Sequence, residues 1–417
     1  MPLAFDLPAP VMEALNRLET AGFAAYTVGG CVRDWVLGMQ PHDYDICTAA
    51  APEEMQRVFR QERTIETGLK HGTLTVLLEG MPLEITTFRK DGEYLDGRHP
   101  AAVSFAAQVE EDLSRRDFTV NAMAYSPLRG LCDPFCGRKD CEKGVIRCVG
   151  EAERRFSEDA LRILRALRFS ARLSFPIEEK TAAALLALRD NLQKISRERI
   201  ASELSGILIG KDCERILTRF GPVIFSAIPE LAFLEGEKWQ ETAAVLSYCP
   251  CDSMIRFAAM LRNSHPSLQA ENCAEKGREI IRGLKMPVKM MDGVHQLISY
   301  RDQPVNEENL QEMLWRLDQE GLSRLLQFKK ALAAFQGENT EKWDALEEKK
   351  QHLLRSGCCY QLNQLAVKGG DLIAMGLRGP AVGEMLERIM LQVAHGKIPN
   401  DYGEIIKYVR YNAERLA

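Results

Sequence analysis

The chain has 417 residues, about twice the usual size of one domain, so more than one packing unit is expected. Its composition, 46% apolar and 27% charged residues, excludes collagen-like, mucin-like and globally disordered chains. Lys and Arg number 54 and Asp and Glu number 59, so the net charge is −5 and any nucleic-acid site must be a local basic patch.

The cellular location is predicted from what the sequence lacks. It contains no apolar run near the roughly 20 residues that cross a bilayer, and no basic segment precedes an apolar core at its start. We therefore expect a cytoplasmic protein that does not enter a membrane. Its 12 cysteines have irregular spacings, which predicts reduced thiols and not a disulfide framework.

The first 150 residues differ from the rest. A helical pattern over 11–22 ends at Gly22, a strand is expected over 25–28, and β-rich runs follow at 73–79 and 83–89. From about Glu151 onward, apolar residues recur at helical spacing almost without interruption. We predict an α+β chain with all strands in its first part, and weak breaks divide the helical part near Gly221-Pro222, 301–308 and Gly337.

Two glycines and two aspartates follow the first predicted strand. Residues i and i+2 of a strand face the same side, so Asp43 and Asp45 can converge on one point. Their repulsion would be relieved by a hard divalent cation, and Mg²⁺ fits best. Gly29 and Gly30 let the backbone approach a ligand, and the next helix start, with Arg33 nearby, would offer N–H groups to a phosphate. The alternative is an ordinary turn with exposed aspartates.

This order of motifs resembles the first motif of the class II tRNA nucleotidyltransferase and bacterial poly(A) polymerase family, within the polymerase-β-like nucleotidyltransferases. Further segments that fit the family lie at 114–125, 148–169, 195–204 and 368–389. The resemblance implies a polymerase-β-like head with a small mixed sheet, followed by helical parts. It places the head at 1–150, a neck that reads the nucleotide base at 151–220, a body at 221–335 and a tRNA-binding tail at 336–417.

A third carboxylate is a candidate for the metal centre. Alternation in the run 83–89 puts Glu84, Thr86 and Phe88 on one face, so Glu84 could join the two aspartates. Glu84 also stands where the family carries an acidic residue. The alternative is a surface glutamate on a hairpin.

The segment 114–125 supplies candidate nucleotide contacts. Arg115 and Arg116 are adjacent and would diverge on a helix, whereas Asp117 and Asn121 would share a face. The resemblance implies that Arg116 contacts the incoming nucleotide, that Asp117 braces the site and that Asn121 contacts sugar or phosphate. A solvated helical turn is the alternative.

Asp159 and Arg162 stand three apart and would meet on one side of a helix as a paired acceptor and donor. Cytosine and adenine offer an amino donor beside a ring-nitrogen acceptor, which complements that pair; uracil and guanine present the reverse. In the family this motif is the protein template for base selection, with Arg165 and Arg168 continuing along it. Residues 154–172 hold six arginines and two acids, which form a local basic patch. The alternative for Asp159 and Arg162 is an ordinary salt bridge on a helix.

Together these features predict a nucleotidyltransferase that adds C, C and A to the 3′ end of tRNA without a nucleic-acid template. The terminal ribose hydroxyl would attack the α-phosphorus of CTP or ATP and release pyrophosphate, with metal held by Asp43 and Asp45. The implied partners are the tRNA 3′ end and elbow, the latter bound by the segment 368–389. An A-adding relative, a poly(A) polymerase and a catalytically silent tRNA-binding protein remain alternatives. The stretch 89–100 resembles a loop that CC-only relatives lack, which favours CCA or A addition.

Overall fold

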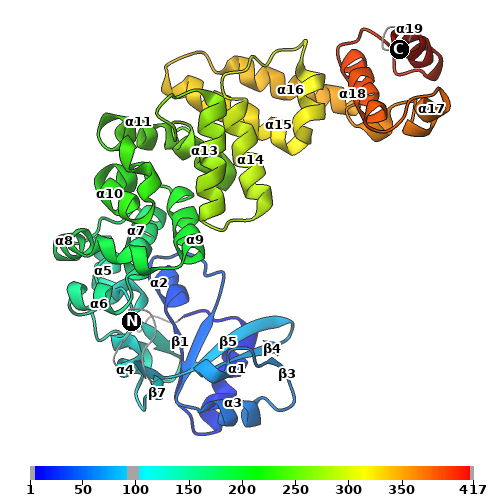
Figure 1. Cartoon of the computed structure of the whole chain (residues 1–417). Helices are drawn as coiled ribbons and strands as arrows, with labels where there is room; N and C mark the ends of the chain where they lie inside the picture. The colour runs from blue at the N-terminus through cyan, green and yellow to red at the C-terminus, as the bar shows by residue number, and fades with distance from the viewer. Residues whose placement is uncertain (1–4, 92–102, 414–417) are drawn as a thin grey trace. The chain divides into compact units, whose positions relative to one another are not determined.

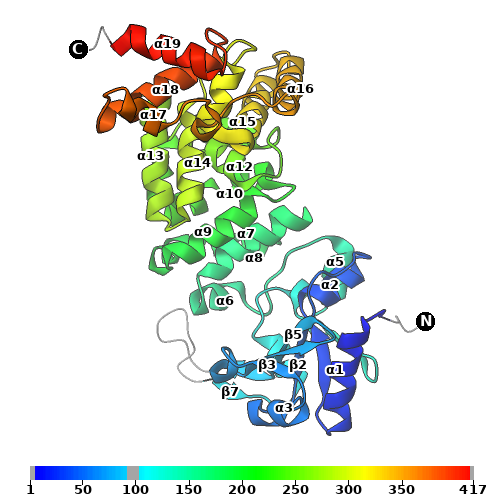
Figure 2. The ribbon, with the colours of Figure 1, turned by 90° about the vertical axis from the view of Figure 1, so that its right-hand side faces the viewer.

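The computed structural model of the chain describes residues 5–91 and 103–413. Its contacts divide it into two compact units, Met1–Glu235 and Gly236–Ala417. Figures 1 and 2 show the elements of each unit. The first unit holds every strand of the described chain, and the regular structure of the second is helical, so the predicted α+β fold class is confirmed.

The first unit begins with a seven-stranded sheet in the order β3-β4-β5-β2-β1-β8-β9. Only β2 and β5 are parallel neighbours in this sheet, which is therefore mixed, as predicted. β6 (Arg89–Asp91) and β7 (Val103–Phe105) pair separately, and the predicted loop at 89–100 lies, from residue 92 on, outside the described residues. The seven strands are Ala25–Val28 (β1), Asp45–Thr48 (β2), Arg63–Ile65 (β3), Thr73–Leu78 (β4), Met81–Thr87 (β5), Ala124–Ser126 (β8) and Gly130–Cys132 (β9).

The hairpin of β4 and β5 follows from its sequence pattern. Alternate residues on both strands are buried, among them Val76 on β4 and Leu83 and Ile85 on β5. The two strands are joined by Glu79 and Gly80, which have φ values of 49° and 82°. Two successive positive φ values give the tight turn whose twist matches that of antiparallel strands.

Helices pack on the sheet at several places. β1 is buried along its whole length. The helix predicted at 11–22 is present as α1 (Ala9–Thr20), which buries Leu15 and Leu18, and both views show α1 and α3 beside the sheet. A separate apolar cluster joins Tyr26 of β1 to Leu113 of α4. The other helices of this part are Gly30–Val36 (α2), Pro52–Val58 (α3), Val109–Ser114 (α4) and Gly137–Lys143 (α5), with short 3₁₀ turns at Leu69–His71 and Thr119–Asn121.

The remainder of the first unit is helical. α7 buries most of its length because apolar residues such as Leu164 and Leu167 face inward. α10 bends at Phe220 (φ −117°, ψ 27°), two residues before Pro222, whose missing N–H and bulky ring disturb a helix. The predicted boundary after residue 220 therefore falls at a bend within one helix. The helices are Ala152–Glu158 (α6), Leu161–Leu173 (α7), Glu179–Ala187 (α8), Arg197–Leu208 (α9) and Cys213–Ala227 (α10), with 3₁₀ turns at Arg189–Lys194 and Pro229–Leu234.

The second unit contains a long helix, α15, that is broken at Asp318, where φ is 61° and ψ is −176°. The Asp318 carboxylate accepts a hydrogen bond from the N–H of Gly321 at 2.8 Å, as a helix-capping side chain does. Trp315, before the break, packs against the apolar cluster of the last helices. The helices are Glu237–Leu246 (α11), Ser253–Leu261 (α12), Ala270–Gly283 (α13), Val288–Ser299 (α14), Leu310–Phe335 (α15), Glu341–Arg355 (α16), Gly369–Ala374 (α17), Pro380–Ala394 (α18) and Tyr402–Ala413 (α19), with a 3₁₀ turn at Leu362–Gln364.

Some local predictions can be compared with these elements. The helix expected to begin near Pro380 is present as α18, and the predicted break near Gly337 follows the end of α15. All twelve cysteines are free thiols. Within residues 5–91 and 103–413, none of the helices combines the length and apolar character needed to cross a bilayer.

Candidate active site

Eleven of the thirteen predicted site residues line one cavity of about 590 Å³ in the first unit. Residues of β1, β2 and β5 contribute to its lining, and so do residues of α7 and α9. Asp43 and Arg168 do not line it: Asp43 is exposed before β2, and Nε of Arg168 donates to Glu203 at 2.6 Å. The eleven are Gly29, Gly30, Arg33, Asp45, Glu84, Arg116, Asp117, Asn121, Asp159, Arg162 and Arg165.

Gly29 occupies a position that favours glycine for two reasons. Its φ is +78°, in the region that L side chains rarely adopt, and a Cβ there would lie 2.9 Å from Nη1 of Arg116. Arg33, in the last turn of the short helix α2, is buried and donates to Asp34 and, at 2.7 Å, to Oδ1 of Asn121. Arg33 therefore braces Asn121 at the cavity wall in this structure.

The carboxylates of Asp45 and Glu84 lie on neighbouring strands, because residue 45 of β2 is paired with residue 84 of the parallel strand β5. Both line the cavity. Desolvation raises the pKa of Asp45 above its usual value; the positive charge of Arg116 opposes the rise, and the negative charges of Glu84 and Asp43 add to it. The sequence prediction treated residues 43 and 45 as one strand, but β2 begins only at Asp45.

The donor chemistry of these carboxylates can be compared with the needs of a divalent cation. Oxygen ligands that repel one another are the set a hard cation stabilises, so Asp45 and Glu84 fit such an ion. With Asp43 they do not form a group whose ligand atoms all lie within 4.8 Å of one another among the described residues. Asp43, in the irregular segment before β2, would therefore have to turn toward the pair to complete the predicted set.

Arg115 and Arg116 do not diverge as predicted, because α4 ends at Ser114 and both guanidinium groups turn back to Asp112. Oδ1 of Asp112 accepts from Nη2 of Arg115 at 2.8 Å, and Oδ2 accepts from Nη2 of Arg116 at 3.1 Å. Asp112 is 1% exposed, and burial acts to raise its pKa, but the two arginines outweigh that effect and lower it. Sequence reasoning missed Asp112, although an acid three and four residues before two arginines is a recognisable signal.

Asp117 and Asn121 both line the cavity, but the predicted shared helix face is wrong because Phe118 is extended (φ −127°, ψ 146°). Asp117 is buried and accepts a hydrogen bond from Nε of Arg165 at 2.6 Å. Burial acts to raise the pKa of Asp117, and the charge of Arg165 more than offsets this, so the pKa lies below its usual value. The pair joins the segment after α4 to α7.

Asp159 and Arg162 both line the cavity, but each is paired with another residue. Asp159 is extended (φ −144°, ψ 106°) and precedes α7, so the helical spacing that predicted their contact does not apply. Nη1 of Arg162 donates to Glu158 at 2.8 Å, and Oδ2 of Asp159 accepts from Nη2 of Arg199 at 2.8 Å. Sequence reasoning gave Arg199 no role, and no local pattern reveals a partner forty residues away.

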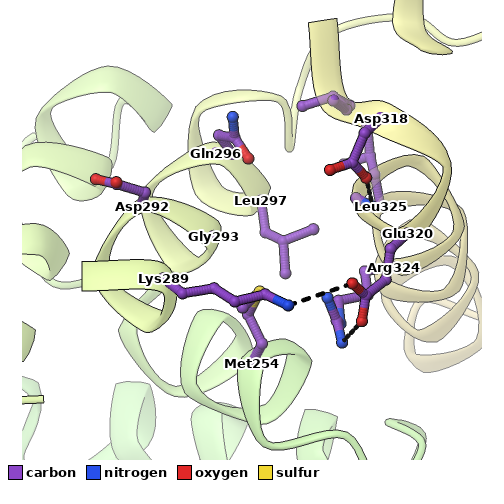
Figure 3. Close-up of a pocket in the computed structure, with 12 residues that line it drawn as sticks. Met254, Lys289, Asp292, Gly293, Gln296, Leu297, Asp318, Glu320, Arg324 and Leu325 are labelled. Carbon is purple, nitrogen blue, oxygen red and sulfur yellow. Dashed lines mark hydrogen bonds and ion pairs between the residues drawn. The ribbon is translucent and has the colours of Figure 1, made fainter. Parts of the chain in front are cut away.

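A smaller cavity of about 220 Å³ lies in the second unit, and it contains none of the predicted site residues. Figure 3 shows Lys289 and Arg324 directed toward Glu320 on one side of this cavity, with Leu297 in its wall. Lys289 and Arg324 both pair with Glu320 here. Because the predicted site residues gather in the cavity of the first unit, that cavity is the candidate active site.

The comparisons with known proteins cover most of the chain. Residues 25–147 match the family described as the Poly A polymerase head domain, residues 174–220 match a probable RNA and SrmB-binding site of polymerase A, and residues 267–409 match a putative tRNA nucleotidyltransferase domain 2. The CCA-adding enzyme of Leuconostoc mesenteroides is 35% identical over 410 residues, which cover 97% of each chain. The chain belongs to the family of CCA-adding enzymes. The enzyme of Geobacillus stearothermophilus is likewise 35% identical, over 96% of each chain.

Solved CCA-adding enzymes also share the fold. The Bacillus stearothermophilus enzyme in complex with CTP is 31% identical, with a TM-score of 0.81, covering 98% of this chain and all of that one. The Thermotoga maritima enzyme complexed with tRNA has a TM-score of 0.60 at 20% identity, covering 98% of this chain and 96% of that one, and so supports the fold alone. The family and the nucleotidyltransferase class predicted from the motifs are therefore confirmed.

Proposed function

We propose that the chain adds C, C and A to the 3′ end of tRNA, with CTP and ATP as donors and pyrophosphate as the second product. The observation that carries this proposal is one cavity that brings carboxylates of β2 and β5 together with the arginine-rich wall of α7 and Asp159. Membership of the CCA-adding family supports the same reaction. The relatives reported above are named CCA-adding enzymes, so they do not favour the A-adding, poly(A) and silent-binder alternatives.

The metal of this reaction is proposed to be Mg²⁺. Asp45 and Glu84 would hold it, with Asp43 completing the set. Bound there, Mg²⁺ would activate the terminal ribose hydroxyl and neutralise charge on the departing pyrophosphate. The carboxylates must be ionised for this role, and the raised pKa of Asp45 means that it ionises at a higher pH than an ordinary aspartate does.

Positive side chains bind the triphosphate. Arg116 is fixed by its ion pair with Asp112. Because Gly29 has no side chain, the guanidinium group of Arg116 fits against it, close enough to Asp45 to influence the pKa of that carboxyl group. A fixed guanidinium presents its donors to phosphate oxygens without first losing rotational freedom. Asn121, braced by Arg33, is proposed to contact sugar or phosphate.

Base selection is proposed to take place at Asp159 and Arg162. Asp159 accepts from the amino group of cytosine or adenine, and Arg162 donates to the neighbouring ring nitrogen. Three of the five N–H groups of Arg162 donate to Glu158 and to the carbonyl groups of Arg155 and Arg115, which leaves two N–H groups that can donate to a base. Arg165 holds Asp117 at the same wall, and Arg168 supports α7 from outside the cavity through its bond to Glu203.

The division into a head at 1–150, a neck at 151–220, a body at 221–335 and a tail at 336–417 also remains a proposal. On this division the neck supplies Asp159 and α7, and the tail binds the tRNA elbow. The glycines and Pro380 at the start of α18 would let the tail approach a sugar-phosphate strand. A reaction on tRNA agrees with the cytoplasmic location proposed from the sequence.

Three tRNA substrates test the function: one ending before CCA, one after the first C and one after CC. Each is incubated with a single nucleotide triphosphate and Mg²⁺. We expect C addition to the first two substrates and A addition to the third. Addition of A alone would indicate an A-adding enzyme, a long A tail would indicate a poly(A) polymerase, and no incorporation despite tRNA binding would indicate a silent binder.

A further inference from the structure

The aromatic ring of Phe169, on α7, lies where three arginines of the first unit meet. The guanidinium carbons of Arg33, Arg165 and Arg168 lie over this ring, at 5.6, 5.5 and 4.5 Å from its centre. Phe169 is 6% exposed and lines the cavity of the candidate active site. The ring is therefore a part of the cavity wall that gathers three positive side chains.

Each of the three arginines has a carboxylate of its own, and the ring is what they share. The pairs are Arg33 with Asp34 at 2.8 Å, Arg165 with Asp117 at 2.6 Å and Arg168 with Glu203 at 2.6 Å. Positive groups gathered around one ring repel one another, and this repulsion is stronger away from water. The electron-rich face of an aromatic ring attracts a cation that lies within about 6 Å of its centre. The ring thus gives all three guanidinium groups an attraction that opposes their mutual repulsion.

Two of these arginines hold polar groups of the cavity wall. Arg33 donates to Oδ1 of Asn121 at 2.7 Å, and Arg165 donates to Asp117 at 2.6 Å. Arg33 belongs to α2 and Arg165 to α7, so the ring of Phe169 connects two elements that are far apart in the chain. A shift of the ring would move both arginines and, through them, the two polar groups.

The plane of the Phe169 ring is itself fixed by a neighbouring ring. Phe118 is fully buried, and its ring centre lies 5.8 Å from that of Phe169 with the two planes at 75°. Aromatic rings favour this edge-to-face arrangement, which orients both of them. A leucine at position 169 would also fill apolar space, but it has no π electrons to attract a cation. Burial alone therefore does not account for an aromatic ring among three arginines.

We propose that Phe169 is a further positioning residue for the reaction, whose ring holds Arg33 and Arg165 in the places from which they fix Asn121 and Asp117. The inference rests on the proposed function, because it assumes that Asn121 contacts the nucleotide and that Asp117 braces the same site. Phe169 acts on the nucleotide through the two arginines.

The test changes the electron density of the ring and leaves its shape almost unchanged. Phe169 is replaced by 4-fluoro-, 3,5-difluoro- and pentafluorophenylalanine, because each added fluorine withdraws electrons from the ring face and weakens its attraction for a cation. Phe156 of α6 receives the same substitutions as the matched control: it is fully buried and has no cation over its ring among the described residues. The Kd for CTP, the KM and kcat for CTP and ATP, tRNA affinity and thermal unfolding are measured for both series.

We expect Kd and KM for both nucleotides to rise with each added fluorine at position 169, by about 5–30-fold in the pentafluoro variant, the loss of two cation–π contacts. The CTP/UTP ratio and tRNA affinity should stay at wild-type values, and the Phe156 series should keep the wild-type KM. F169L should raise KM at least as much, since it removes the π electrons entirely.

Three results would overturn the inference: a KM that does not depend on fluorination, a series at Phe156 that changes in the same way, or an F169L enzyme with wild-type KM. A purely structural role would lower kcat and the Tm through the loss of folded enzyme and leave KM unchanged. If the pentafluoro variant does not fold, the monofluoro and difluoro variants carry the same test. The Kd for CTP is read without turnover, so a wild-type enzyme that binds CTP and adds no C would instead refute the proposed function.

Discussion

Replacing Asp112 by Asn tests whether Arg116 needs its ion pair with Asp112 in order to bind the triphosphate. The substitution keeps the shape of the side chain and removes its charge. It also puts an amide N–H₂ in place of one carboxylate oxygen, so one of the two guanidinium groups faces a donor and not an acceptor. Asp112 is 1% exposed, and solvent cannot replace the lost bonds directly.

The size of the effect follows from the contacts. The carboxylate accepts four bonds from the two arginines, at 2.8–3.3 Å, and one from the N–H of Arg89 at 3.2 Å. Breaking a buried ion pair is destabilising by about 3–5 kcal/mol, and the low end applies because Arg115 and Arg116 are 19% and 23% exposed. About 3 kcal/mol lowers the Tm of a unit of this size by roughly 6–12 °C. Loss of one charge-assisted hydrogen bond at Arg116 predicts a rise of about tenfold in the KM for nucleotides.

The assay measures KM and kcat for CTP and ATP together with thermal unfolding. E111Q is the matched control, because Glu111 is the neighbouring acid on α4 and its side chain is 40% exposed in a long contact to Lys90. We expect KM to rise equally for CTP and ATP in D112N, with the CTP/UTP ratio unchanged, because Arg116 is proposed to bind phosphate and not the base. A D112N enzyme with wild-type KM, or one whose loss falls on a single nucleotide, would show that Asp112 does not act through Arg116.

Three further predictions concern the same cavity. D45A should abolish incorporation of CTP and ATP while tRNA affinity survives, because dispersed phosphate contacts bind tRNA; a mutant that keeps a tenth of the turnover contradicts the metal assignment. Removing the negative charge of Glu84 in E84Q should lower the pKa of Asp45, so the acid limb of the residual activity should move to lower pH, and a move to higher pH contradicts the reasoning. G29A should raise the KM for nucleotides more than G38A does: both glycines have positive φ, but only at Gly29 would a Cβ meet Arg116, and equal effects would show that backbone strain alone is responsible.

The limits of prediction from the sequence can be traced to particular residues. Alternation in β4 and β5 and helical spacing in α7 were readable because each depends on residues two to four positions apart. The set of cavity residues was predictable because the motifs carry chemistry that few other sites need. Their pairing was not, since it depends on where helices end: α4 ends at Ser114, which lets Arg115 and Arg116 converge.

Long-range partners were beyond the sequence for a different reason. Arg199 meets Asp159 only because α7 and α9 pack together, and local spacing contains no trace of that contact. Asp43 shows that the exact first residue of a strand was also beyond prediction from the sequence. A strand that begins two residues later than assumed leaves its first carboxylate without the expected orientation.

The parallel pairing of β2 with β5 makes the position of the Glu84 carboxylate depend on the packing of the hydrophobic core. Leu83 and Ile85 are fully buried, and Glu84 lies between them on the opposite face, across from Asp45. A slip of one residue would drive both apolar side chains toward the cavity and Glu84 into the interior, which the fold resists strongly. An inserted residue in the turn at Glu79 and Gly80 should therefore bulge outward before it disturbs the carboxylates. A chain in which this hairpin pairs out of register would therefore fail to bury Leu83 and Ile85, and it would not fold into an enzyme with a misplaced Glu84.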